Sequence, residues 1–346
     1  MQRICFAVLA TLLVTNSRVC GQQAATVPDG TVLTQEPYRL PHKTIDAWFS
    51  EVKRADSTFG PERQARARKA FGPGFDRLRG AGVRVTKIGY ASGGYRVVGY
   101  LLTPRTERGK RYPALIYNRG GNRDFGQLGL RNLIELSDLA ARGYIVVASQ
   151  YRGNDGGEGR EEFGGADVED VLNLLPVLDA RSDVDTSRIG MYGWSRGGMM
   201  TYLALARTDR IRAAVIGAGV SDHFDTIRHR PDMESGVFAE LIPDYLATKD
   251  SALRARSAVY WADRLHKRTP ILMLHGTGDW RVDASQALRM ATRLYETRHP
   301  FRLVLFEGGD HGLTEYWGDV DSLILQWLDT YVRDRKPWPS LDPHGR

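Results

Sequence analysis

Cysteine is nearly absent from this chain. Its 346 residues include two, Cys5 and Cys20, and both stand within the first 21 positions. If those positions are removed as a leader, disulfides, thiol catalysis and cysteine-ligated zinc are excluded together. Stability then has to come from a packed core, and a chain of this length is large enough for one α/β domain with a substantial core.

Other chemical signatures are also missing. The chain has no H-E-x-x-H pair, no paired carboxylate ligands and no Walker motif, so the sequence gives no support for a metal or any other cofactor. The formal net charge is +7, but the excess is spread along the chain. We interpret it as a solvated basic surface and expect no nucleic-acid partner.

Apolar residues near the N-terminus form only a short run, Ile4–Val14, which is too short for a membrane span. Arg3 precedes the run, and Val19 and Gly21 follow it at the −3 and −1 positions of a cleavage site. This is the pattern of a signal peptide over residues 1–21.

We therefore expect a bacterial exported protein, periplasmic or extracellular, whose mature chain begins near Gln22. Two alternatives stay open. Cys20 is a potential lipid-anchor site, although Arg18 stands where a small residue would be expected. The apolar run is otherwise a first strand or a buried helix.

The most informative stretch is Gly193-Trp194-Ser195-Arg196-Gly197-Gly198. It lies between an apolar run, Ile189–Tyr192, and a helix-forming run, Met199–Ala206. Strand, sharp turn and helix are the context in which a G-x-S-x-G match is meaningful, because the turn leaves the serine hydroxyl exposed at its tip. The pattern predicts Ser195 as a nucleophile.

Two later segments supply partners for the serine. A buried strand ending in His275 runs into a glycine-rich loop that carries Asp279, and a further strand runs into a loop that carries His311. The order Ser195, Asp279, His311 is that of an α/β-hydrolase triad. Asp310 is the rival acid and His275 the nearest rival histidine.

At this point a resemblance can be stated. GWSRGG, HGTGDWRV and GGDHGL resemble the three catalytic signatures of the prolyl oligopeptidase family of serine peptidases, and QYRGNDGGEG, FGGADVEDVLNLLPVL and GAGVSD resemble segments between them. The similarity covers about Val83 to Val332. It implies an α/β-hydrolase fold, with a mostly parallel sheet and helices on both faces, and a Ser-Asp-His mechanism.

The oxyanion formed during acyl transfer needs fixed hydrogen-bond donors. The backbone N–H of Arg196 is one candidate. The second is expected from the loop Asn118–Gly121, as a backbone N–H of Arg119 or Gly120. The family often has tyrosine or histidine at the position of Arg119, so the arginine is a departure, and its side chain is a candidate cation facing the substrate.

The rest of the chain reads as follows. Residues 22–80 form an N-terminal helical extension, beginning with a polar leader over Gln22–Glu36; residues 81–336 form the hydrolase domain. In the extension we expect helices at Lys43–Lys53 and Pro61–Ala70, followed by a linker at Gly72–Gly82. The hydrolase domain should begin with a β-hairpin at Val83–Thr103 and continue with alternating strands and helices. Pro176 should kink the helix Val168–Asp179.

The alternation breaks between Asp222 and Lys267. We expect this excursion to be a cap over the site; the alternative is a surface excursion that only covers the sheet edge. Candidate contacts to the substrate are Trp194 and Trp280, which flank catalytic residues and are as readily interpreted as packed aromatics, together with Arg152 and His223.

The expected function is peptide-bond cleavage through an acyl-enzyme on Ser195, with a small molecule or short peptide as substrate. The large members of the family carry a β-propeller before the hydrolase domain, and fewer than a hundred residues precede the hairpin here, so we expect no propeller. Carboxylesterase activity on small acyl esters is the close alternative, and a hydrolase-like binding protein without turnover is a third. The sequence makes no prediction about P1 preference or oligomeric state.

Overall fold

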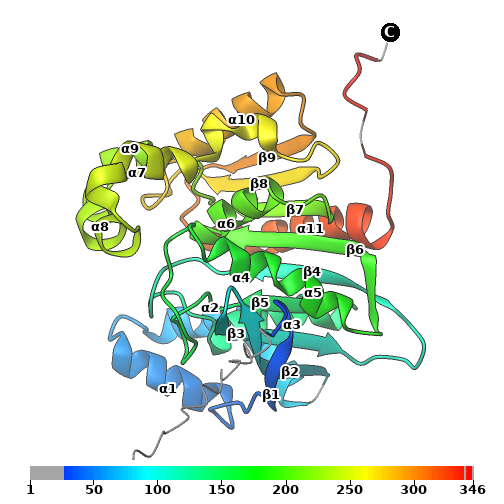
Figure 1. The fold of residues 1–346 in the computed structure, drawn as a ribbon. Helices are drawn as coiled ribbons and strands as arrows, with labels where there is room; N and C mark the ends of the chain where they lie inside the picture. The colour runs from blue at the N-terminus through cyan, green and yellow to red at the C-terminus, as the bar shows by residue number, and fades with distance from the viewer. Residues whose placement is uncertain (1–26, 81, 339, 345–346) are drawn as a thin grey trace, which may run out of the picture.

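A nine-stranded sheet runs through the described part of the chain, residues 27–80, 82–338 and 340–344, in a computed structural model (Figure 1). The strand order is β1-β2-β3-β5-β4-β6-β7-β8-β9. The pairings from β1 to β5 are antiparallel and those from β5 to β9 are parallel. The strands are β1 (Val32–Pro37), β2 (Val83–Ser92), β3 (Tyr95–Pro104), β4 (Tyr112–Asn118), β5 (Ile145–Ser149), β6 (Val184–Trp194), β7 (Ile211–Gly217), β8 (Ile271–Gly276) and β9 (Phe301–Phe306).

Helices cover both faces of the sheet, as predicted for an α/β-hydrolase (Figure 1). They are α1 (Ile45–Ala55), α2 (Pro61–Arg79), α3 (Leu130–Ala141), α4 (Val168–Leu172), α5 (Leu174–Asp179), α6 (Arg196–Leu205), α7 (His223–His229), α8 (Ala239–Leu241), α9 (Tyr245–Ala255), α10 (Ser285–Glu296) and α11 (Trp317–Leu328). Short 3-10 or π turns are η1 (Glu234–Phe238), η2 (Ala258–Tyr260), η3 (Ala262–Arg264), η4 (Thr314–Tyr316) and η5 (Asp329–Arg333).

Two large hydrophobic cores result, one on each face of the sheet, and a smaller cluster joins α2 to α3. Leu115 and Val146 belong to the core under α3 and α11, whereas Ile116 and Val147 belong to the core under α4, α5, α6 and α10. Successive residues of a strand point to opposite faces, so a strand covered on both sides must be apolar throughout. All seven residues of β4 are buried for this reason, which explains the uninterrupted apolar runs in the sequence.

The polar leader predicted for Gln22–Glu36 is wrong in its last part. Val32–Pro37 forms β1, which pairs antiparallel with β2. All six residues of β1 are exposed. A strand that buries no face has no alternation of apolar and polar residues, so the sequence carried no signal for it.

The linker predicted at Gly72–Gly82 is also wrong, because α2 continues to Arg79. Pro73 lies inside the helix, and Gly74 allows close contact with α3: a Cβ there would lie 2.6 Å from Ile134 Cγ2. The glycine thus serves helix packing and does not end the helix. The helix predicted over 168–179 is interrupted, but at Asn173, between α4 and α5. Pro176 lacks the N–H that would bond to the carbonyl four residues earlier.

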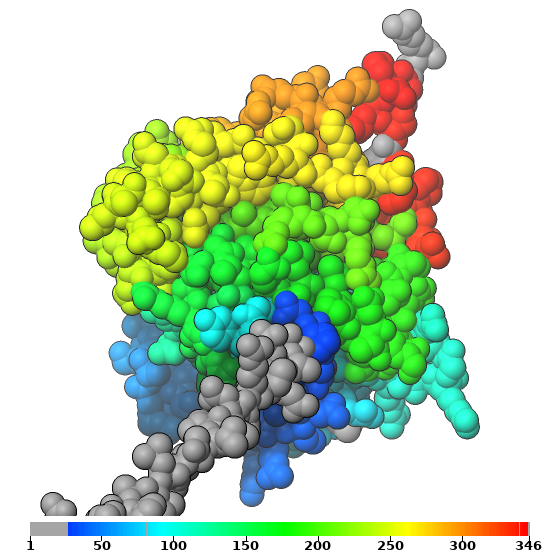
Figure 2. Space-filling model, in the orientation of Figure 1, coloured from blue at the N-terminus to red at the C-terminus, as the bar shows by residue number. Residues whose placement is uncertain are grey.

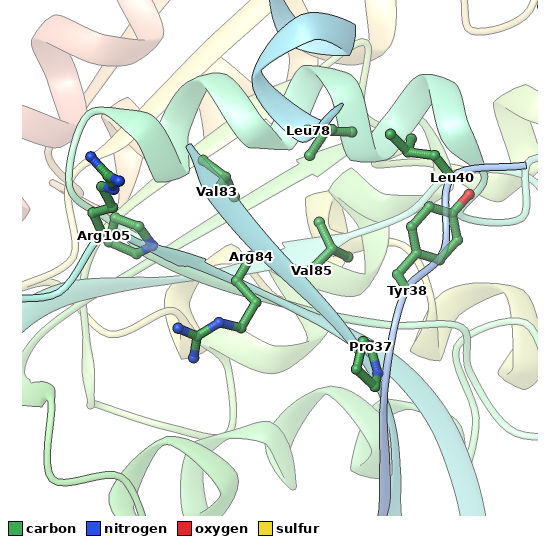
Figure 3. A pocket seen from close by; sticks show the side chains of 9 residues that line it. Pro37, Tyr38, Leu40, Leu78, Val83, Arg84, Val85 and Arg105 are labelled. Atoms are coloured by element: carbon green, nitrogen blue, oxygen red, sulfur yellow. The ribbon is translucent and has the colours of Figure 1, made fainter. Parts of the chain in front are cut away.

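One pocket lies beside the N-terminal extension and has a volume of about 250 Å³ (Figure 3). Tyr38, Leu78 and Val85 line it, together with Leu40, Pro37, Val83, Arg84, Pro104 and Arg105. These residues come from the ends of β1, β2, β3 and α2. None of them belongs to the loops that follow β4, β6, β8 and β9, where the candidate site is found.

Candidate active site

Ser195 stands alone between the end of β6 and the start of α6. Its φ of 59° and ψ of −123° lie in a region that non-glycine residues rarely adopt. Glycines on either side make the turn possible, because a Cβ on Gly193 would lie 2.1 Å from the carbonyl oxygen of Gly197, and one on Gly197 would lie 1.9 Å from that of Asn118. The Ser195 N–H donates to the Gly217 carbonyl at 2.8 Å. This is the strained strand-turn-helix expected of a nucleophile.

Asp279 and His311 meet at the ends of β8 and β9. His311 Nδ1 lies 2.7 Å from Asp279 Oδ2. An ionised carboxylate can only accept, so Nδ1 carries a proton, and in the neutral ring Nε2 is the nitrogen with the free lone pair. The other carboxylate oxygen accepts the backbone N–H groups of Arg281 at 2.8 Å and Val282 at 3.0 Å. Asp279 is thereby fixed from both sides.

The two rival residues have other partners. Asp310 closes its own turn, because its Oδ1 accepts the N–H groups of Gly312 at 2.9 Å and Thr314 at 3.0 Å. His275 approaches the same carboxylate oxygen as His311 but at a longer distance: its Nε2 is 2.9 Å from the Val282 carbonyl and 3.4 Å from Asp279 Oδ2. Asp279, and not Asp310, contacts the His311 ring.

The pKa of Asp279 is held well below its usual range. Burial alone would raise it, but the hydrogen bonds from His275 and His311, the charge of His311 and the N–H of Val282 outweigh burial. The carboxylate therefore stays charged throughout the pH range in which a histidine titrates, and it can stabilise His311 when the ring gains a proton.

Trp194 ties the serine turn to the histidine loop. Its indole Nε1 donates to the His311 carbonyl at 2.8 Å. Its ring lies against Gly217, where an added Cβ would be 2.0 Å from Trp194 Cε3. These contacts support the interpretation of Trp194 as a packed aromatic.

Among the described residues no hydrogen bond joins Ser195 Oγ to the His311 ring, and in an unliganded site such bonds are often long until substrate binds.

Gly120 lies directly against the nucleophile. A Cβ built on it would be 3.2 Å from Ser195 Cβ and 3.9 Å from Ser195 Oγ. On the other side, Arg196 is the first residue of α6, so its N–H has no acceptor within the helix. The two backbone N–H groups predicted as oxyanion donors thus flank one serine.

The prediction that the Arg119 side chain faces the substrate is wrong. The guanidinium is fully buried and donates to the carbonyls of Gln150 at 3.0 Å, Gly120 at 3.1 Å and Arg123 at 3.3 Å. Carbonyl acceptors in the protein interior hold the cation away from the site. Burial, followed by the nearby charge of Arg196, lowers the pKa of Arg119 to about 10.

Arg196 has a buried side chain that sequence reasoning missed. It pairs with Glu161 and with Asp167, the latter at 2.6 Å, and donates to the Gly121 carbonyl at 3.0 Å. Burial raises the pKa of Glu161, but the charge and hydrogen bond of Arg196 outweigh it and lower the pKa. The available signal was the acidic run after QYRGNDGGEG, which had no assigned role.

Two predicted substrate contacts are also wrong. Arg152 is 5% exposed, and its guanidinium holds Asp170, with Nη2 2.7 Å from Oδ1. His223 is buried, with Nε2 2.9 Å from Met199 Sδ. Burial, then the charges of Arg256 and Arg196, lowers its pKa to about 3. Neither side chain reaches the surface of the site.

Trp280 is the predicted contact that remains available. It is 67% exposed, with the guanidinium of Arg281 4.8 Å and that of Arg230 5.3 Å from the ring centroid. Arg281 also lies 5.4 Å from the ring centroid of Phe125. These side chains form a rim beside Asp279.

The excursion between β7 and β8 contains α7, α8 and α9. Figure 2 shows it as the yellow-green to yellow atoms at the upper left of the view. It is joined to loops of the site, because Arg123 Nη2 donates to the Gly236 carbonyl at 2.7 Å and Arg256 Nε donates to the Phe163 carbonyl at 3.0 Å.

Within the described ranges, no group of three or more His, Cys, Asp or Glu residues is arranged to hold a metal ion. In the same part of the chain, no helix has the length and apolarity needed to cross a bilayer. The predicted signal peptide and both cysteines lie outside the described residues.

The comparisons with known proteins agree with this geometry. The model of the prolyl oligopeptidase family matches residues 132–335, a stretch that contains Ser195, Asp279 and His311. The chain belongs to the prolyl oligopeptidase family. It is therefore a serine hydrolase, and its family is one of peptidases.

Among its relatives, the uncharacterized peptidase YtmA of Bacillus subtilis is 32% identical over 63% of this chain and 82% of its own length. Dipeptidyl-peptidase 5 of Porphyromonas gingivalis is 28% identical over 70% of this chain and 36% of its own length. The solved structure of a puromycin-hydrolyzing peptidase of Mycobacterium tuberculosis has a TM-score of 0.59 and 28% identity, over 69% of this chain and 38% of its own. The chain thus spans most of the first relative and less than half of the other two.

Proposed function

We propose that this protein is an exported serine peptidase that cleaves short or flexible peptides through an acyl-enzyme on Ser195. The observation that carries the proposal is the 2.7 Å contact between His311 Nδ1 and the buried Asp279 carboxylate. It leaves Nε2 as the basic nitrogen, in a loop that Trp194 ties to the serine turn. The family and the relative YtmA support a peptidase.

In the proposed reaction Ser195 Oγ attacks the scissile carbonyl carbon and His311 Nε2 takes the hydroxyl proton. The carbonyl oxygen becomes an oxyanion facing the N–H groups of Arg196 and Gly120. His311 then gives its proton to the leaving amine, the C–N bond breaks, and an acyl ester on Ser195 remains. Water then attacks the acyl ester with His311 again taking and returning the proton, and the acid is released from Ser195. Asp279 keeps the ring oriented throughout.

Small carboxylic esters are the second candidate substrate class. The observation that favours them is an exposed aromatic side chain next to the acid: Trp280, which follows Asp279, is 67% exposed. An ester needs less orientation than a peptide, because its leaving alcohol departs more readily than an amine. The excursion over residues 222–267 is the proposed source of selectivity, since it contacts the loops beside Gly121 and Phe163.

Labelling with a fluorophosphonate tests the nucleophile. We expect one adduct, on Ser195, and none in Ser195→Ala. Aminoacyl-nitroanilides of one to four residues, assayed beside p-nitrophenyl acetate and butyrate, then decide between the classes. Hydrolysis of esters alone would favour the esterase, and a label that persists in Ser195→Ala would remove the nucleophile.

Export is tested separately, by intact mass and N-terminal sequencing of protein secreted from a bacterial host. A mature terminus near Gln22 supports the proposal. Retention of Met1, or a lipid on Cys20, contradicts it.

A further inference from the structure

Three consecutive carbonyl groups in the loop after β4 are each bound from inside the protein. The Arg119 carbonyl accepts the Tyr151 hydroxyl at 2.9 Å, the Gly120 carbonyl accepts Arg119 Nη1 at 3.1 Å, and the Gly121 carbonyl accepts Arg196 Nη1 at 3.0 Å. A carbonyl oxygen facing the reacting centre would repel a developing oxyanion. All three are engaged by buried donors.

The first of these bonds fixes the peptide between Arg119 and Gly120. A trans peptide is planar, so its N–H points opposite to its C=O. With the Arg119 carbonyl held on Tyr151, the Gly120 N–H is turned to the other side of the plane. Gly120 itself packs on the nucleophile, because a Cβ added to it would lie 3.2 Å from Ser195 Cβ.

We propose that Tyr151 is a positioning residue, whose hydroxyl aims the Gly120 N–H at the oxyanion by holding the Arg119 carbonyl. The inference rests on the proposed acyl transfer at Ser195. It assigns the second oxyanion donor to Gly120 and gives Tyr151 a role in catalysis without contact to the substrate.

The surroundings of Tyr151 hold its side chain in one position. It is fully buried and has a φ of 62°, rare for a residue with a side chain. Its own N–H donates to Ser149 Oγ at 2.9 Å. Two cations pack on its ring, with the Arg119 guanidinium 5.1 Å and the Arg196 guanidinium 4.8 Å from the centroid. The ring therefore has little freedom, and the hydroxyl stays where the carbonyl needs it.

A direct role for the hydroxyl is excluded by the same contacts. A phenol has one proton to donate, and in Tyr151 that proton is given to Arg119 within the core. Burial, its largest influence, raises the pKa of Tyr151, so the group stays protonated and keeps donating at any pH at which the enzyme would work.

The test is Tyr151→Phe, which removes the hydroxyl and keeps the ring. Tyr144→Phe is the matched control: Tyr144 is also fully buried, lies just before β5 as Tyr151 lies just after it, and donates its hydroxyl to Asp329 Oδ1 at 2.7 Å. Among the described residues its hydroxyl makes no hydrogen bond to the loop after β4. Each variant loses one hydrogen bond, which is buried at Tyr151 and partly buried at Tyr144. They are compared by thermal midpoint, by kcat and KM with p-nitrophenyl acetate, and by inhibition with a trifluoromethyl ketone, which forms an oxyanion on the serine.

Removing an oxyanion donor altogether lowers kcat about 10²- to 10³-fold. A donor that is present but points in the wrong direction should lower kcat by less. We expect Tyr151→Phe to lower kcat roughly tenfold to a hundredfold and to weaken ketone binding by a similar factor, with KM within about twofold. Tyr144→Phe should match its stability and keep its kcat. Replacing Tyr151 by 4-aminophenylalanine, which retains a donor, should restore kcat, whereas 4-fluorophenylalanine, which fills the space without donating, should not.

Equal kcat values for Tyr151→Phe and Tyr144→Phe, or a raised KM at unchanged kcat, would overturn the inference. If Tyr151→Phe does not fold, the pair of 4-amino and 4-fluoro side chains decides the question. A wild-type protein that neither takes the fluorophosphonate nor cleaves an ester would instead remove the proposed function, and this inference with it.

Discussion

The two sides of Ser195 are supported in different ways. On the oxyanion side, the loop over residues 119–126 and Arg196, the support is buried charge: Arg196 is 2% exposed and pairs with two carboxylates, Glu161 and Asp167. On the acid–base side, the loops over 276–282 and 307–313, the support is a chain of hydrogen bonds from backbone N–H groups through Asp279 to His311.

The difference follows from what each side has to do. Oxyanion donors act without changing their own charge, so they gain from a rigid setting. His311 must take up and release a proton in each cycle, and its side chain keeps 19% of its surface exposed beside a fully buried carboxylate. Damage to the acid–base side should therefore remove activity and spare stability, whereas loss of the buried charge that supports the oxyanion side should lower stability first.

The largest expected effect is on the acid–base side. Asp279→Asn keeps the shape of the side chain but favours the wrong tautomer of His311, and we expect kcat to fall about 10⁴-fold with little change in the thermal midpoint. Asp310→Asn is the control, because Asp310 only caps its own turn. Similar losses of kcat in both variants would show that Asp279 is not the specific partner of the ring.

The next effect tests the buried charge. Arg196→Met leaves Glu161 and Asp167 without their cation, and we expect the free energy of unfolding to fall by about 3–5 kcal/mol. Arg119→Met should cost less, about 1–3 kcal/mol, because Arg119 donates only to carbonyls. Urea unfolding measures both. A larger loss for Arg119→Met would mean that the carboxylates are stabilised by other partners.

The smallest effect is a pH dependence at His223, which lies near the charges of Arg256 and Arg196. The pKa of His223 is lowered to about 3 in the folded protein, while in the unfolded chain it is about 6.5. Below about pH 6.5, His223 binds a proton in the unfolded state but stays neutral in the folded state. The free energy of unfolding therefore falls as pH falls, by about 2 kcal/mol at pH 5. His223→Leu should remove that part of the slope. Parallel pH profiles for the two proteins would contradict the prediction.

The parts of the site that the sequence predicted are those determined by local order along the chain. Ser195, Asp279 and His311 each follow a strand of the parallel part of the sheet, and parallel strands bring their carboxyl ends to one edge of the sheet. Asp310 is adjacent to His311 in the sequence, and adjacent side chains tend to diverge, which favours Asp279 as the acid. The contact between Asp279 and His311 agrees with that argument.

The parts that failed depend on pairing across the chain. Arg152 pairs with Asp170, which is 18 positions away in the sequence. Arg196 pairs with Asp167 and Glu161, which are 29 and 35 positions away. A single sequence does not say whether an arginine after a strand points to solvent or to such a partner. The same limit applies to His223, whose environment comes from Met199 and Phe163 on other elements.

The outermost strand of the sheet has a consequence for handling the protein. β1 covers the hydrogen-bonding edge of β2, a ten-residue strand, and is itself exposed and ends at Pro37. A short strand with a terminal proline is a poor template for further pairing, whereas a long bare strand invites other chains to add to it. A protein trimmed to begin at Tyr38 should keep the geometry of Ser195 but self-associate as its concentration rises. The exposed strand before α1 would then protect the edge of β2 from pairing with other chains.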